Sequence, residues 1–91
     1  MVEHELSLTP SFSDDGFEDM ARGLGLVVKR MSLAKYPGSV HWHLSRPGEP
    51  GVLEATWIPG QRLWLSVHEN RRAGWHDTAI QQIMDACSPR S

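Results

Sequence analysis

The chain has 91 residues, which is enough for one hydrophobic core and too few for two independent domains. Hydrophobic residues make up 40% of it, so burial can offset the entropy that folding costs. Nine Lys and Arg residues against eleven Asp and Glu residues give a net charge of -2, which excludes a general attraction of the chain to nucleic acid or anionic lipid.

Hydrophobic periodicity and turn residues predict the elements in chain order. Strands are expected at residues 2–8, 26–33, 40–44, 52–58 and 62–68. A first helix is expected between the first two strands, capped by Ser11 or Ser13 and stopped by Gly25. A second helix follows Gly74 and ends before Ser88-Pro89.

The last three strands alternate clearly and are joined by turns rich in Pro and Gly, which predicts an antiparallel meander. One face of this meander carries the apolar residues Val40, Trp42, Leu44, Leu53, Ala55, Trp57, Leu63, Leu65 and Val67. Each helix has a single apolar stripe, so both helices should cover that face. The predicted fold is a single α+β domain over residues 2–88. It is a two-layer sandwich of two helices on a meander of three to four strands, with room for an extra N-terminal strand.

The opposite face of the sheet should then be open to solvent. If the turns set the register, it carries His41, His43, Glu54, Thr56, Trp64, Ser66 and His68. Imidazoles and a carboxylate are zinc ligands, so His41, His43, His68 and Glu54 form a candidate zinc site. Solvated histidines on a sheet face are more common, so we assign no metal or cofactor from the sequence and keep zinc as an alternative.

A large aromatic residue on an open sheet face, here Trp64, usually marks a surface on which something stacks. The stacked object is either an RNA base, with Arg62 and other basic residues on the phosphates, or a protein partner or second copy of the chain. A one-residue shift of the strand would instead bury Trp64, but the alternation of Leu63, Leu65 and Val67 argues against it.

A catalytic interpretation uses one of these histidines as a general base, oriented by Glu54 or Ser66. No nucleophile motif accompanies it. Cys87 lies on the apolar stripe of the second helix and is interpreted as a core residue. Arg71-Arg72 precedes that helix and either holds an anion or forms a solvated loop.

The segment Gly38-Ser39-Val40-His41 resembles the Gly-Ser-x-His strand of HicA-type toxin ribonucleases. The order of a helix, a three-stranded meander and a helix, from about Phe17 to Cys87, is similar to the double-stranded-RNA-binding fold of that family. The resemblance implies that His41 is the general acid or base in RNA cleavage.

Taken together, the sequence favours a small binding module that uses the His41, His43 and Trp64 face for a protein partner or RNA. A HicA-like ribonuclease is the alternative, and the sequence does not decide whether the protein is an enzyme. The N-terminus lacks a signal-peptide pattern, the single cysteine cannot form an internal disulfide, and no apolar run approaches about 20 residues. We therefore expect a cytoplasmic protein with no membrane partner.

Overall fold

Five strands and two helices make up the part of the chain that the structure, a computed structural model, describes, namely residues 2–32, 37–68 and 74–87. In chain order they are β1 (Val2–Glu5), α1 (Asp14–Gly23), β2 (Val27–Ser32), β3 (Val40–Ser45), β4 (Leu53–Ile58), β5 (Arg62–Val67) and α2 (Gly74–Cys87). Neither helix in these ranges is long and apolar enough to cross a membrane.

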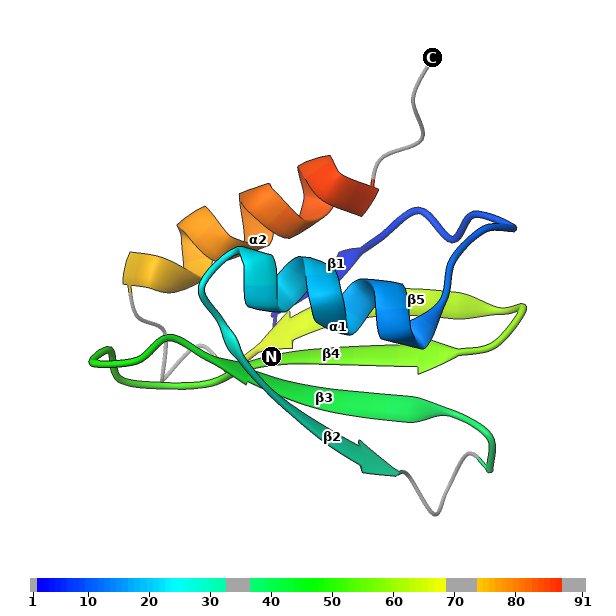
Figure 1. Ribbon diagram of the computed structural model, residues 1–91, viewed down its shortest axis with the longest axis horizontal. Helices are drawn as coiled ribbons and strands as arrows, with labels where there is room; N and C mark the ends of the chain where they lie inside the picture. The colour runs from blue at the N-terminus through cyan, green and yellow to red at the C-terminus, as the bar shows by residue number, and fades with distance from the viewer. Residues whose placement is uncertain (1, 33–36, 69–73, 88–91) are drawn as a thin grey trace.

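The strands form one antiparallel sheet in the order β1-β5-β4-β3-β2 (Figure 1). This confirms the predicted α+β class and the extra N-terminal strand. The sheet has five strands, slightly more than the three to four predicted for the meander, because β2 to β5 form a four-stranded meander and β1 adds a fifth strand beside β5. The first strand is also shorter than expected and ends at Glu5 rather than at residue 8.

Both helices lie on the same face of the sheet and form the second layer, as the sequence predicts (Figure 1). Their buried residues Phe17, Ala21, Trp75, Ala79, Ile80 and Ile83 join the apolar face of the strands in one core. The nine strand residues predicted for this face all belong to that core, and only Trp57 among them is partly exposed.

Helix α1 is fixed above β3 by a buried carboxylate as well as by apolar packing. Ser13 caps the helix by accepting a hydrogen bond from the Gly16 amide at 3.0 Å. One turn into the helix, Glu18 accepts a hydrogen bond of 2.9 Å from the indole N–H of Trp42, whose side chain is fully buried. Arg30 of β2 donates to the same carboxylate at 3.2 Å. The helix layer is thereby tied to the two strands on one side of the sheet.

The register of β3, β4 and β5 sets the side chains of the open face. His41 lies opposite Thr56, and His43 lies opposite Glu54. On the other side of β4, Thr56 lies opposite Trp64. Because side chains alternate along a strand, these residues all point away from the helices. The predicted register is therefore confirmed.

Candidate functional site

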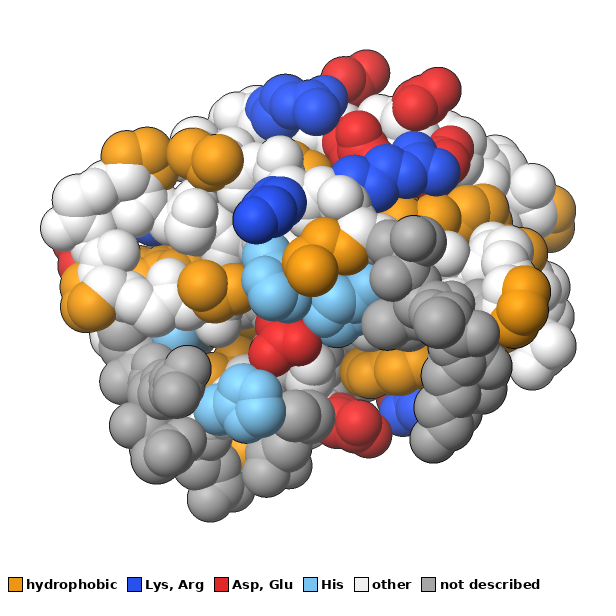
Figure 2. Space-filling model, turned by 90° about the horizontal axis from the view of Figure 1, so that it is seen from below, with side chains coloured by type: hydrophobic (Ala, Val, Ile, Leu, Met, Phe, Trp, Pro, Cys, Tyr) orange, Lys and Arg blue, Asp and Glu red, His pale blue; other side chains and the backbone are white. Residues whose placement is uncertain are grey.

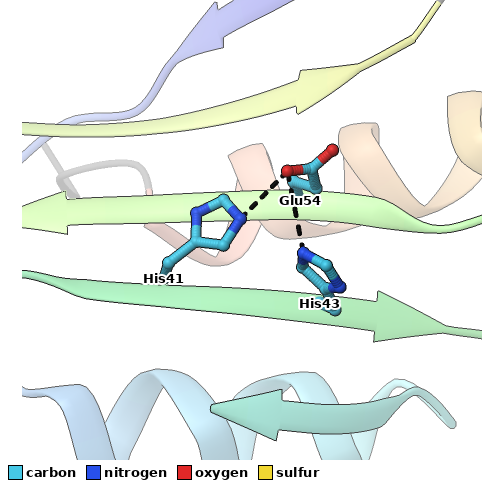
Figure 3. A group of neighbouring side chains, drawn as sticks. All are labelled: His41, His43 and Glu54. Atoms are coloured by element: carbon cyan, nitrogen blue, oxygen red, sulfur yellow. Dashed lines mark hydrogen bonds and ion pairs between the residues drawn. The ribbon is translucent and has the colours of Figure 1, made fainter. Parts of the chain in front are cut away.

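The carboxylate of Glu54 is the meeting point of three histidine side chains on the open face. His41 Nε2 lies 2.9 Å from Glu54 Oε1, and His43 Nε2 lies 3.7 Å from the same oxygen. His68 Nε2 lies 3.1 Å from the other oxygen, Oε2. Figure 3 shows the two imidazoles of β3 turned toward the carboxylate on β4, with the helices behind the sheet. The four residues proposed from the sequence as a zinc site are thus brought together.

The ring of His41 is held at both nitrogens. Its Nδ1 forms a hydrogen bond of 2.9 Å with the hydroxyl oxygen of Thr56, its cross-strand neighbour. Thr56 is only 3% exposed, so water has little access to this bond. The hydroxyl group can either donate to the nitrogen or accept from it, and it can therefore serve both tautomers of His41.

Exposure increases from one side of the cluster to the other. The side chains of His41 and Glu54 are 14% and 19% exposed, whereas those of His43 and His68 are 36% and 48% exposed. Figure 2 shows this face, with three histidine side chains around a carboxylate that reaches the surface. A ligand between the imidazoles would rest on a nearly buried base and stay open to solvent.

The donor atoms have nearly the spacing that a metal ion requires. One nitrogen each from His41 and His43 and one oxygen of Glu54 all lie within 4.8 Å of one another. A tetrahedral ion with bonds of about 2.0 to 2.1 Å places its ligand atoms about 3.3 Å apart. The two observed separations from Glu54 Oε1, 2.9 and 3.7 Å, lie on either side of this value. The third separation, between the two imidazole nitrogens, is within 4.8 Å, so an ion would have to draw the side chains together.

Trp64, predicted as the stacking residue, is half-buried rather than fully open. The guanidinium carbon of Arg62 lies 4.0 Å from the centre of the indole ring. Arg62 in turn forms ion pairs with Glu5 and Glu3 of β1, the second at 3.2 Å. The hydrogen bond from Arg62 to Glu5, followed by that to Glu3, raises the pKa of the guanidinium above its usual value. One face of the indole is therefore covered by an ion-paired arginine.

Three predicted residues remain, and the structure describes only one of them. Arg71 and Arg72 lie outside the described residues. Cys87 lies on α2, in the layer behind the sheet, and is partly buried against the core. Burial raises the pKa of its thiol, which therefore stays protonated at neutral pH and is a poor nucleophile. This agrees with the interpretation of Cys87 as a core residue.

Sequence reasoning did not predict which residues of the edge strands flank the cluster. The register places Lys29 of β2 opposite His43 and Met31 opposite His41. On the other edge, Glu5 lies opposite Trp64. The alternation in each edge strand indicates which residues share a face, but it does not indicate which strand becomes its neighbour.

Comparison with protein-family models, with curated proteins and with solved structures finds no match to this chain. The resemblance of residues 38–41 to HicA-type ribonucleases stays a prediction. In the structure, Gly38 adopts a left-handed backbone conformation with φ +86, and β3 begins two residues later. This turn leads the chain into the strand that presents His41 on the open face.

Proposed function

We propose that this domain binds a divalent transition-metal ion, with zinc as the first candidate, through His41, His43 and Glu54. The observation that supports the proposal is that both imidazoles direct Nε2 at one carboxylate oxygen, while Thr56 holds the far side of the His41 ring. Neutral imidazole and carboxylate are preferred ligands of zinc. A metal-bound histidine usually donates its other ring N–H to an oxygen of the protein, and Thr56 supplies that oxygen.

The strands would supply the ligands from a rigid frame. His41 and His43 are two residues apart on β3, so both rings project from the same face, and Glu54 projects from the adjacent strand. His68 contacts the second carboxylate oxygen and would orient Glu54 rather than bind the ion. Three protein ligands leave at least one coordination position for water or another molecule, as in catalytic rather than structural zinc sites.

Ion binding would rearrange hydrogen bonds that already exist. Glu54 in its ionised form is only an acceptor, so the 2.9 Å bond from His41 Nε2 uses a proton on that nitrogen. A metal ion would take the place of this proton between the two groups, and Nδ1 would take up a proton from solvent in exchange. Nδ1–H of His41 would then donate to the Thr56 hydroxyl, which keeps the ring in place throughout the exchange.

The other functions indicated for this face receive less support from the geometry. A base or a protein partner that stacks on Trp64 would find one face of the indole ring already covered by Arg62. Arg62 is itself paired with two carboxylates, those of Glu3 and Glu5. Acid–base catalysis by His41 would, like metal binding, have to replace a hydrogen bond at one of its two nitrogens, and the sequence has no nucleophile motif to accompany it. Both functions remain outcomes that an RNA-cleavage and RNA-binding assay can detect.

The proposal is tested by titrating Zn²⁺ into the tag-free chain after treatment with a chelator, using calorimetry. We expect one ion per chain. A second titration with Co²⁺ should give the visible absorption of a cobalt ion with nitrogen and oxygen ligands, which reports on coordination directly.

Two histidine variants show whether the ion occupies the proposed site. His43→Ala removes a ligand from a partly exposed position and should weaken Zn²⁺ binding by at least about 100-fold. His4→Ala is the matched control, because His4 lies opposite Leu65 on the helix side of β1 and should leave binding unchanged. Absence of binding by the wild type, or equal binding by the His43 variant, would refute the proposal.

A further inference from the structure

Lys29 lies beside the proposed metal centre, and its positive charge can contact a ligand there. It is exposed and lies directly opposite His43 in the register of β2 and β3. Opposite residues in an antiparallel pair have Cβ atoms about 4.5 to 5.5 Å apart, so a lysine side chain can reach above its neighbour. Among the described residues, Lys29 forms no ion pair.

The coordination position that the protein leaves open on the metal would face the side of the cluster that is open to solvent. His41 and Glu54 form the buried base of the cluster, and His43 is the more exposed of the two ligands on β3. A molecule that approaches the ion over His43 would pass Lys29, which lies opposite on β2.

The residues that the structure describes do not balance the positive charges at this place. A divalent ion with one carboxylate and two neutral imidazoles keeps one positive charge, and Lys29 adds another. The nearest carboxylates from β1, Glu3 and Glu5, are paired with Arg62 at the other edge of the sheet. A ligand with two negative charges and several oxygen acceptors would complete the site.

We infer that the metal centre binds a phosphate group, with one oxygen on the ion and another accepting a hydrogen bond from the ammonium group of Lys29. This inference rests on the proposed metal-binding function and names the class of molecule that the site takes. The ligand is either inorganic phosphate or the terminal phosphate of a monoester, because both present the same oxygens to the ion and to Lys29.

The test uses the Zn²⁺-loaded protein, freed of excess metal, and titrates it with inorganic phosphate and then with phenyl phosphate. The Co²⁺-loaded protein is titrated in parallel, because an oxygen ligand entering the coordination sphere changes the visible spectrum. We expect saturable binding of at least one of the two probes, and the tighter one identifies the source of the phosphate group.

A pair of charge-neutralising variants tests the role of Lys29. Lys29→Gln should weaken phosphate binding by about 10-fold, the loss expected for a hydrogen bond between charged groups, and should leave Zn²⁺ affinity unchanged. Arg22→Gln, which makes the same change of charge on the exposed surface of α1, should leave both affinities unchanged.

The outcomes separate this inference from the function on which it rests. If Zn²⁺ binds and His43→Ala abolishes it, but neither probe changes the Co²⁺ spectrum, the metal site stands and the phosphate inference is overturned. The inference is also overturned if phosphate binds equally well to the protein without metal, or if Lys29→Gln and Arg22→Gln weaken it equally. If the wild type binds no Zn²⁺, both proposals fail.

Discussion

The hydrogen bond between Thr56 and His41 gives the sharpest test of how the cluster is organised. Thr56→Val keeps the shape of the side chain and removes only the hydroxyl group, which lies 2.9 Å from His41 Nδ1. The variant should fold, because Thr56 is buried and valine fits the same volume in a strand. His41, however, loses the partner that fixes its ring.

Two effects of different size are expected. Loss of a residue that orients a metal ligand costs about 10- to 100-fold in metal affinity, which corresponds to about 1.4 to 2.7 kcal/mol of binding free energy. Without metal, Nδ1 of His41 is left without its partner in a side chain that is only 14% exposed. This should lower the free energy of unfolding by about 1 to 2 kcal/mol.

The affinity is measured by competition of the protein with a chromophoric chelator for Zn²⁺, and the stability by urea unfolding in excess chelator. Thr78→Val is the control, because Thr78 is exposed on α2 and the substitution is the same. If Thr56→Val binds Zn²⁺ as tightly as the wild type while His43→Ala does not bind, the bond does not orient His41 for metal binding. The role given to Thr56 would then be wrong.

Two further predictions concern the contacts that hold α1 on the sheet. Trp42→Phe should lower the free energy of unfolding by about 2 to 4 kcal/mol, because it removes a hydrogen bond to a buried carboxylate and leaves space in the core. In a urea-unfolding double-mutant cycle, Glu18→Gln should cost less in the Trp42→Phe background than in the wild type, and strict additivity would contradict the coupling. Asp14 accepts a hydrogen bond from Arg30, which lowers the pKa of its carboxyl from 3.8. A lowered pKa in the folded state stabilises the fold above the ordinary Asp pKa, and this stabilisation is lost as the pH falls through the lowered value. Asp14→Asn should therefore be less stable than the wild type at neutral pH, with a difference in urea midpoint that shrinks in acid and in high salt; a constant difference would contradict the ion pair.

Alternation along the strands was enough to predict the two faces of the sheet. Val40, Trp42 and Leu44 take one side of β3, and His41 and His43 must then take the other, because successive side chains of a strand point in opposite directions. The turns predicted before β4 and β5 indicated the register, so Glu54 and Thr56 could be placed beside the histidines. The residues of the candidate site were therefore predictable.

The sequence did not predict what each of these side chains does there. Whether three imidazoles merely share a face or converge on one oxygen depends on rotamers, which alternation does not determine. The two hydrogen bonds of His41 and the contact of Arg62 with the Trp64 ring are such details, and they support the proposed metal centre over a stacking surface.

The sequence by itself therefore determined the elements, the apolar face and the set of polar residues opposite it, because these follow from local periodicity and turn chemistry. Only the tertiary structure decided that β1 pairs with β5, which brings Glu5 to Arg62. It also set the register of β2 on β3, which places Lys29 opposite His43. Pairing of strands that are distant in the chain depends on how all the elements pack at once. No local pattern in the sequence records it.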